Sequence, residues 1–296
     1  MTINKSNNTK GIILAAGKAS RLFPITYAVN KQLLHIYDKP MIYYPLSVLM
    51  LSGIREILII TRKEDLTNFK ALLGNGNHLG IKLFYKIQKK PKGIADAFII
   101  GEKFISQSNC VLILGDNIFY GEGFSGKLMK AISKKEGATI FSYPVSDPER
   151  YGVVELDKNN MAKKIVEKPK KPSSNLAVTG LYFYDNQVAN IAKSLKPSKR
   201  GELEITDVNK IYLKKKQLNV ETFGRGFAWW DTGTPDSLLN ANNFIATIEQ
   251  SQGLKVACLE EIAFNNKWIS KEELKKLANL ISYGPYRNYL NKILKK

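Results

Sequence analysis

The sequence predicts an α/β fold, doubly wound around a mostly parallel mixed sheet, with a helical appendage at its C-terminal end. Short apolar runs alternate with helical patterns through the first part of the chain, an order typical of parallel strands joined by crossover helices. After residue 137, strand-like segments have fewer helices between them, which indicates that the sheet continues. Helical patterns dominate the end of the chain, where we expect packing or assembly rather than chemistry.

The individual elements follow from these patterns. Early strands are predicted over residues 11–15, 56–61, 82–87 and 110–114, and early helices over 41–51, 66–73 and 94–105. Later strands are predicted over residues 138–145, 152–156, 163–167, 178–184 and 219–222, and later helices over 204–215, 235–250, 259–268, 271–280 and 286–295. Since no linker or repeat interrupts the first part, we expect an α/β domain over residues 1–250 and the appendage over residues 251–296.

Composition indicates an ordinary globular protein. The 296 residues are 44% hydrophobic and 24% charged, which argues against disorder. No apolar run approaches the ~20 residues of a membrane span, and residues 1–10 lack the apolar segment of a secretory signal. Because Cys110 and Cys258 are the only cysteines and Cys110 falls in a predicted buried strand, we expect no disulfide framework and a reducing cytoplasm.

The net charge of +19 is compatible with nucleic acid, an anionic membrane surface or phosphorylated small molecules as partners. Most of the excess is lysine in helical stretches expected to be exposed, and neither zinc-finger spacing nor a ribonucleoprotein aromatic motif is present. We therefore favour a lysine-rich enzyme surface. Non-specific nucleic-acid binding is the alternative, and a salt titration would reveal it.

Two carboxylates are the first candidates for a site. An apolar run over residues 111–114 ends in Gly115 and Asp116, and Asp231 follows Trp229 and Trp230. Each alone is typical of a turn or a helix N-cap. On two strand ends at one edge of a sheet, however, a pair of acids can hold a divalent metal against phosphates.

The segment after the first predicted strand, residues 14–22, combines small residues with Lys18 and Arg21, a combination suited to a phosphate. It matches neither a Walker loop nor a dinucleotide fingerprint, because the required glycines are missing and Pro24 interrupts any helix. His35 and His78 lack the partners of a catalytic dyad, so we expect no covalent catalysis.

Seven segments together resemble the pyrophosphorylase signature of the sugar nucleotidylyltransferases, in particular members that use dTTP and glucose 1-phosphate. They are residues 14–46, 114–117, 147–155, 167–169, 178–185, 200–207 and 229–234. The resemblance implies a Rossmann-like nucleotidyltransferase fold and Mg²⁺-dependent formation of dTDP-glucose and pyrophosphate. It also implies a first step toward dTDP-rhamnose and other dTDP-sugars for cell-surface polysaccharide, carried out by a cytoplasmic homotetramer with no membrane or specific nucleic-acid partner.

The same resemblance implies a role for each matching residue. Asp116 and Asp231 would hold Mg²⁺, Arg21 would stabilise the leaving pyrophosphate, and Lys31 would lie over the α-phosphate. Nucleotide contacts are implied for Leu14, Ala16, Gly17, Ser20, Gln32, Gln88 and Gly93. Sugar-phosphate contacts are implied for Asn117, Tyr151, Gly152, Glu167, Lys168 and Val178, with Lys168 orienting the phosphate.

Some positions depart from the family pattern. Ala16 and Ala19 stand where the family has glycine, Asn30 replaces serine, His35 replaces proline and Asp96 replaces glutamine. Alanine tolerates positive φ poorly, so a strained phosphate loop is expected if residue 19 needs such a conformation. The alternatives are the same chemistry with another nucleotide or sugar, or a non-catalytic relative that retains the fold.

Overall fold

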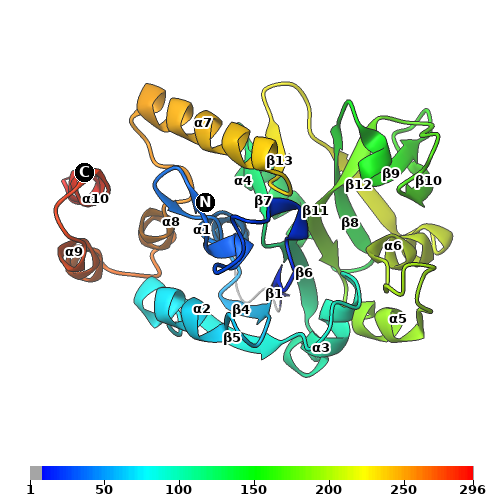
Figure 1. Ribbon diagram of the computed structural model, residues 1–296, viewed down its shortest axis with the longest axis horizontal. Coiled ribbons are helices and arrows are strands. Elements are labelled where there is room, and N and C mark those ends of the chain that lie inside the picture. The colour runs from blue at the N-terminus through cyan, green and yellow to red at the C-terminus, as the bar shows by residue number, and fades with distance from the viewer. Residues whose placement is uncertain (1–8, 296) are drawn as a thin grey trace.

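A nine-stranded sheet forms the centre of the computed structural model, which describes residues 9–295 (Figure 1). Its parallel part has the order β5-β4-β1-β6, so that β4 and β5 lie on one side of β1 and β6 lies on the other. These strands are β1 (Thr9–Ala15), β4 (Glu56–Thr61), β5 (Lys82–Ile87) and β6 (Asn109–Leu114). The strand order reverses at β1, so the predicted doubly wound fold is confirmed, and the carboxyl ends of β1 and β6 mark its switch point.

Antiparallel strands extend the sheet beyond β6. β11 (Leu176–Tyr184) pairs with β6, with β8 (Ala138–Pro144) and with β9 (Gly152–Leu156). β10 (Ala162–Glu167) lies beside β9, and β12 (Leu218–Thr222) runs parallel to β8. The prediction that strands after residue 137 continue the sheet is confirmed.

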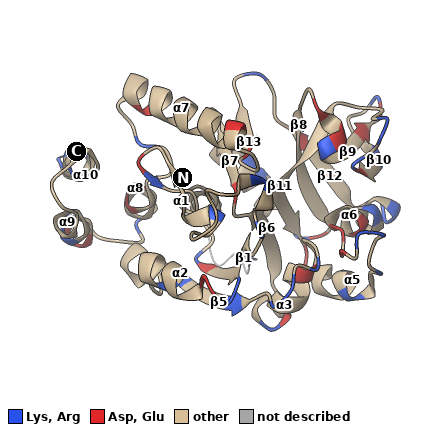
Figure 2. Ribbon diagram, viewed as in Figure 1, with Lys and Arg blue, Asp and Glu red and all other residues tan. Residues whose placement is uncertain are grey.

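Charged side chains of both signs lie on the elements around the sheet (Figure 2). Several lysines pair with acids on other elements, as Lys130 does with Glu221 and Lys163 with Glu155. Figure 2 shows basic residues spread over many elements rather than gathered on one. This distribution is that of a lysine-rich enzyme surface.

Each face of the parallel strands is covered by its own helices, because successive side chains of a strand point to opposite faces. Ile13, Ile57 and Val111 belong to one core cluster, and their neighbours Ile12, Leu58 and Leu112 belong to the other. The first cluster lies under α1 (Tyr43–Leu51), α2 (Leu66–Leu73) and α4 (Phe124–Ile132). The second lies under α3 (Asp96–Ile105), α5 (Val188–Ser194) and α6 (Ile205–Lys214).

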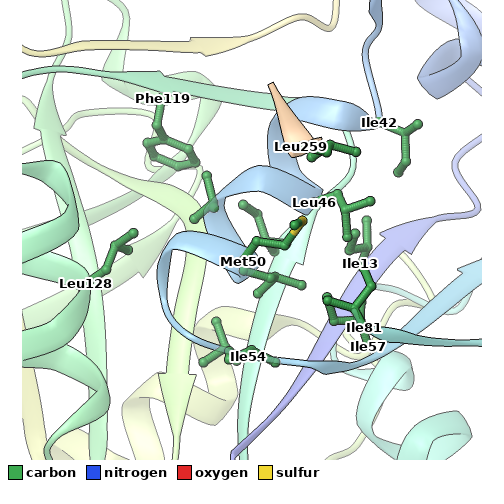
Figure 3. Close-up of a cluster of buried hydrophobic side chains, with 14 of the residues drawn as sticks. Ile13, Ile42, Leu46, Met50, Ile54, Ile57, Ile81, Phe119, Leu128 and Leu259 are labelled. Carbon is green, nitrogen blue, oxygen red and sulfur yellow. The ribbon is translucent and has the colours of Figure 1, made fainter. Parts of the chain in front are cut away.

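Helix α1 is buried on all sides. Leu46 and Met50 of this helix lie among Ile13 of β1, Phe119 and Leu259 (Figure 3). A helix that is apolar all round is stable only inside the protein. Here the sheet covers one side of α1, and α8 (Leu259–Asn265) covers the other.

The C-terminal helices follow the catalytic motifs. α7 (Pro235–Gln252) begins with a capping box between Thr234 and Ser237 and ends at Gly253, whose φ is 64°. The remaining helices are α8, α9 (Lys271–Leu280) and α10 (Pro285–Leu294). The helical appendage is confirmed, whereas a domain boundary at residue 250 stays a prediction. No helix within residues 9–295 is both long and apolar enough to cross a membrane, and the expectation about the N-terminus concerns mainly residues 1–8, outside the described residues.

Two pairs of short strands and two helices were not predicted. Strands β2 (His35–Ile36) and β3 (Lys39–Pro40) form one hairpin, which is too short to show a sequence period. Strands β7 (Asn117–Tyr120) and β13 (Ala228–Asp231) form the other pair, from segments far apart in the sequence. The unpredicted helices are α4 and α5, and 3₁₀ turns occur over Ser20–Leu22, Lys31–Leu33, Asn77–Leu79 and Pro148–Arg150.

Candidate active site

The two predicted metal-binding carboxylates lie side by side at the switch point of the sheet. Gly115 follows β6, and its N–H donates to Leu14 O at 2.9 Å. A Cβ at Gly115 would lie 2.9 Å from Gln32 Cγ, so only glycine allows this turn to pack so closely. Strand β13 pairs with β7 so that Asp231 lies opposite Asn117, directly beside Asp116.

Lys31 is the direct partner of Asp116. Its Nζ donates to Asp116 Oδ2 at 2.6 Å, and the lysine is only 4% exposed. Burial is the largest single influence and opposes ionisation of Asp116, but the charge and hydrogen bond of Lys31, together with the hydrogen bond from Asn117, hold the pKa of Asp116 below its ordinary value. Burial, together with the charge of Asp116, raises the pKa of Asp231. Ionisation is therefore favoured for Asp116, whereas burial and the neighbouring negative charge disfavour it for Asp231.

Arg21 lies against the loop that follows Asp231. A Cβ at Gly233 would lie 2.7 Å from Arg21 Nη2 and 3.3 Å from Asp231 Oδ1. Arg21 itself is exposed and makes no ion pair within residues 9–295. Its planar guanidinium is thus free to bind an anion beside the two carboxylates.

Asn117 holds the two carboxylate segments together. Its Nδ2 donates to Asp116 Oδ1 at 3.1 Å, while its Oδ1 accepts from Gly180 N at 2.9 Å and from Trp229 Nε1 at 2.7 Å. The bond from Trp229 fixes the strand that ends at Asp231 against the segment of Asp116. Asn117 also borders the cavity described next, so its position agrees with the sugar-side prediction while its amide is engaged in the scaffold.

A cavity of about 310 Å³ opens beside the carboxylates. It is lined by all six predicted sugar-phosphate residues, together with Arg21, Asp116 and Asp231: Asn117, Tyr151, Gly152, Glu167, Lys168 and Val178. Glu167 Oε2 accepts from Thr206 Oγ1 at 2.5 Å, and Glu167 Oε1 lies 3.4 Å from Arg200 Nη2. The six residues predicted to contact the sugar phosphate therefore share one cavity, while their contacts with a sugar stay a prediction.

Arg200 and Thr206 were missed as site residues. Both line the cavity and contact Glu167. The signal was present, since both lie within residues 200–207, one of the seven segments that carry the family resemblance. Arg200 also pairs with Glu204 at 2.7 Å, which orients its guanidinium toward Glu167.

The predicted phosphate loop connects β1 to the 3₁₀ turn at Ser20. Ala19 has φ 50° and ψ 35°, so this position does require the left-handed conformation that glycine adopts more easily. Thr26 Oγ1 donates to Ala19 O at 3.2 Å, and Leu22 N donates to the same oxygen at 2.9 Å. Leu14, Ala16, Gly17 and Ser20 all belong to this region, though none of them lines the cavity.

The predicted base-contacting residues, Gln32, Gln88 and Gly93, lie outside the lining of the sugar cavity. Gln88 follows β5, and its N–H donates to Thr61 O at 2.9 Å. Gly93 has φ 94°, and its backbone packs against Leu203, where a Cβ would lie 2.5 Å from the carbonyl oxygen. Gln32 is buried, and its Oε1 has no hydrogen-bond partner among the described residues. Such an acceptor is one that a bound donor could satisfy.

The donor set fits a hard divalent cation. Asp116 and Asp231 supply oxygen ligands of the kind Mg²⁺ prefers, and Mg²⁺ commonly uses one or two carboxylates together with substrate phosphates. No group of three or more potential ligand side chains occurs within residues 9–295. Burial and, after it, the charge of Asp116 raise the pKa of Asp231, and a bound cation would offset the repulsion between the two carboxylates.

Comparison with known proteins now decides the family. The model of the nucleotidyl transferase family matches residues 10–248. A glucose-1-phosphate thymidylyltransferase of Neisseria meningitidis is 56% identical over 97% of this chain and 100% of its own length. The chain belongs to the nucleotidyl transferase family, among its glucose-1-phosphate thymidylyltransferases. A Mycobacterium tuberculosis glucose-1-phosphate thymidylyltransferase is 50% identical over 97% of this chain and 99% of its own length.

Solved structures agree with this membership. A Bacillus anthracis structure, assigned as a glucose-1-phosphate thymidylyltransferase and determined with sucrose, shares 43% identity at a TM-score of 0.74, covering 80% of this chain and 94% of that one. A UDP-glucose pyrophosphorylase with UDP-glucose shares 27% identity at a TM-score of 0.71, covering 81% of this chain and 99% of that one. The Neisseria and Mycobacterium relatives match 97% of this chain, so the sequence match includes most of the residues of the helical appendage.

Proposed function

We propose that the enzyme transfers a thymidylyl group from dTTP to glucose 1-phosphate, giving dTDP-glucose and pyrophosphate. The observation that carries the proposal is the convergence of Arg21, Lys31, Asp116 and Asp231 beside the Glu167 cavity, in a chain that resembles thymidylyltransferases over 97% of its length. Both substrates are anionic, so the site must neutralise and align charge rather than supply a nucleophile.

The reaction is a displacement at phosphorus. A phosphate oxygen of glucose 1-phosphate forms a bond to the α-phosphorus of dTTP, and the bond from that phosphorus to the bridging oxygen breaks. The electron pair leaves with pyrophosphate, so the enzyme itself is not modified. Lys31 would neutralise the α-phosphate, Arg21 the leaving pyrophosphate and Lys168 the sugar phosphate.

Asp116 and Asp231 are the residues that would hold Mg²⁺, which supplies charge neutralisation on the phosphates when bound. The Lys31–Asp116 bond of 2.6 Å keeps the lysine at this position before substrate arrives. Glu167, steadied by Thr206, would accept hydrogen bonds from the hexose hydroxyls.

Release of pyrophosphate is the direct test. The purified enzyme would be assayed with Mg²⁺ against dTTP, UTP and dCTP, each combined with glucose, galactose and mannose 1-phosphates. We expect dTTP with glucose 1-phosphate to give the highest kcat/KM. Release only with another pair would reassign the substrates, and no release with any pair would indicate a non-catalytic relative.

The proposal extends to the cellular setting. We expect a cytoplasmic homotetramer that supplies dTDP-glucose for dTDP-rhamnose and other dTDP-sugars of cell-surface polysaccharide. Leu280 at the end of α9 and Tyr283 after it are 83% and 88% exposed, which supports a role of the appendage in subunit contacts. Light scattering at micromolar concentration measures the assembly, and a monomer would contradict it.

A further inference from the structure

Gln88 is held in a defined place at the edge of the sheet. Its backbone extends the β4–β5 pairing through the bond to Thr61, and its side chain is largely buried. Only the direction of its terminal amide is free to vary, because rotation by half a turn exchanges the oxygen and the nitrogen.

Asp96 removes that freedom. Gln88 Nε2 donates to Asp96 Oδ2 at 2.8 Å, and both residues are only 8% exposed. Asp96 is the first residue of α3, a position that suits negative charge. An ionised carboxylate only accepts hydrogen bonds, so a reversed amide would place oxygen against oxygen in a buried site.

The remaining groups of the Gln88 amide are then determined. Within residues 9–295 the side chain of Gln88 makes one hydrogen bond, from Nε2 to Asp96, so its Oε1 and the second N–H stay available to a ligand. Thymine presents an N3–H donor next to a carbonyl acceptor, which this pair of groups matches. Cytosine presents an unprotonated N3 next to an amino group, so it would place acceptor against acceptor and donor against donor.

We propose that Asp96 is a specificity-determining positioning residue, which locks the Gln88 amide in the direction that accepts an imide base and rejects cytosine. The inference rests on the proposed function, since it assumes that Gln88 faces the base of the triphosphate. The lock belongs to this chain, because the family pattern has glutamine at position 96. A glutamine amide can pair with either direction of Gln88.

The test compares wild type with Asp96→Asn, which keeps the side-chain size but can donate as well as accept. We expect the kcat/KM preference for dTTP over dCTP to fall by about tenfold or more, the worth of a hydrogen bond to a charged group. The preference for dTTP over dUTP should stay within about twofold, because both bases carry N3–H. The KM for glucose 1-phosphate should not change.

Two further variants keep the result interpretable. Asp96→Gln introduces the residue of the family pattern and should also lower the preference for dTTP over dCTP. The test can therefore be made with whichever of the two variants folds. Asp157→Asn removes one charge from an exposed turn, where its carboxylate accepts from Asn159 N and Met161 N, and should change neither ratio. Binding of dTDP and dCDP by calorimetry gives the same comparison without turnover.

An unchanged dTTP to dCTP ratio in folded Asp96→Asn and Asp96→Gln would overturn the inference while leaving the proposed function standing. An equal fall in both ratios would overturn it as well, because it would show general loosening of the pocket. If wild type shows no turnover of dTTP with glucose 1-phosphate, the proposed function fails first, and the calorimetric ratio still decides the role of Asp96.

Discussion

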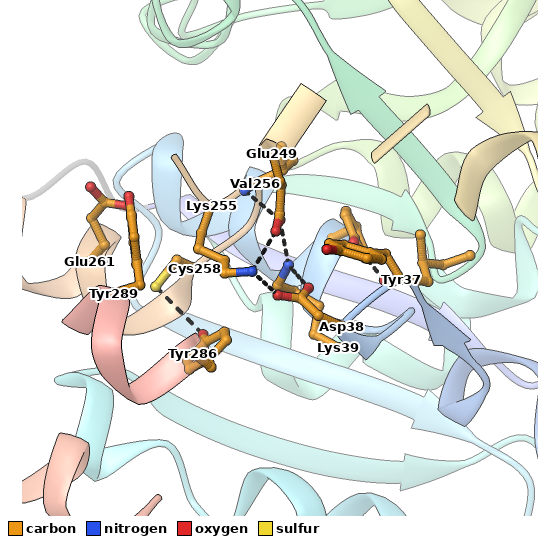
Figure 4. A network of polar contacts seen from close by, with 12 residues as sticks. Tyr37, Asp38, Lys39, Glu249, Lys255, Val256, Cys258, Glu261, Tyr286 and Tyr289 are labelled. Atoms are coloured by element: carbon orange, nitrogen blue, oxygen red, sulfur yellow. Dashed lines mark hydrogen bonds and ion pairs between the residues drawn. The ribbon is translucent and has the colours of Figure 1, made fainter. Parts of the chain in front are cut away.

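Two groups of charges, each with two cations and two carboxylates, lie in different parts of the enzyme. One is the active-site group of Arg21, Lys31, Asp116 and Asp231. The other, which we call the buried network, consists of Asp38, Lys39, Glu249 and Lys255, and joins the β2–β3 hairpin to the end of α7 (Figure 4). The same charge balance serves different purposes in the two places.

In the buried network every charged side chain has an oppositely charged partner within the protein. Glu249 accepts from Lys39 at 2.8 Å, from Lys255 at 2.7 Å and from Val256 N at 2.9 Å, and Asp38 pairs with both lysines. The Glu249 side chain is only 3% exposed. Such a closed network leaves no capacity for a ligand, and it attaches the segment after α7 to the core.

The active-site group is open by contrast. Lys31 and Asp116 pair directly, but Arg21 is exposed and has no ion-pair partner among the described residues. The raised pKa of Asp231 shows that its charge is not fully compensated. Charged side chains without an oppositely charged partner at the edge of a cavity can bind phosphates and a metal ion. The presence or absence of such side chains therefore distinguishes the binding site from the structural network.

The largest expected effect is a loss of stability when one carboxylate of the buried network is removed. Glu249→Gln removes one of the two carboxylates that neutralise the buried Lys39, leaving only Asp38, and should lower the free energy of unfolding by about 3 kcal/mol, the low end for a broken buried ion pair. Urea denaturation measures this loss, and kcat at a temperature where the variant is folded should stay within about twofold of wild type. Glu122→Gln, an exposed acid without an ion pair among the described residues, is the matched control and should change stability by less than about 0.5 kcal/mol. Equal losses in both variants would contradict the structural role.

The next largest expected effect concerns the two carboxylates of the active-site group. Asp116→Asn and Asp231→Asn should each lower turnover by about 10²–10³. Asp231→Asn should not lower the free energy of unfolding at neutral pH. The reason is that a raised pKa means the ionised form is disfavoured in the folded state, so removing the charge removes a cost. Pyrophosphate release and urea denaturation check the two parts.

Asp236→Asn, an exposed acid in the first turn of α7, is the control for the active-site carboxylates. We expect it to keep near-normal turnover. Near-normal turnover of Asp116→Asn or Asp231→Asn at saturating Mg²⁺ would show that the residue concerned does not hold the metal.

The smallest expected effect concerns backbone strain, which occurs both near the active site and near the buried network. Ala19 in the phosphate loop and Ala257 beside the buried network both have positive φ, 50° and 53°. Left-handed alanine costs roughly 1 kcal/mol, so Ala19→Gly should lower the KM for dTTP several-fold and leave the KM for glucose 1-phosphate unchanged. Ala257→Gly should change neither KM. If Ala19→Gly also leaves both KM values unchanged, strain at this residue does not limit triphosphate binding.

Much of the fold was predictable because its signals are local. The runs around Ile13, Ile59 and Ile113 are apolar without alternation, as strands buried on both faces must be, and all of them became parallel strands. Helix α9 was predicted with its observed bounds, since Ser270 and Glu273 form a capping box at its start. Helices α4 and α5 were missed, because each is short and lies between segments read as strand or loop.

The site was predictable where a motif surrounds a residue. Asp116, Lys31 and Glu167 were named from their segments and lie where expected, around one cavity or its rim. Arg200 was missed although its segment was noted, because a single arginine on a loop is ordinarily a solvated surface residue. Its role in the cavity depends on Glu167 and Glu204, which reach it only in the folded chain.

The sequence by itself determined the alternation of the longer strands and helices, the family and the residue types of the site, because these depend on periodicity and on motifs within short segments. Only the tertiary structure decided which charges meet. The pairing of β7 with β13 brings Asp231 beside Asp116, and the end of α7 brings Glu249 to Lys39. Electrostatic energy depends on the distance and burial of two charges, and neither quantity is set by their separation along the chain.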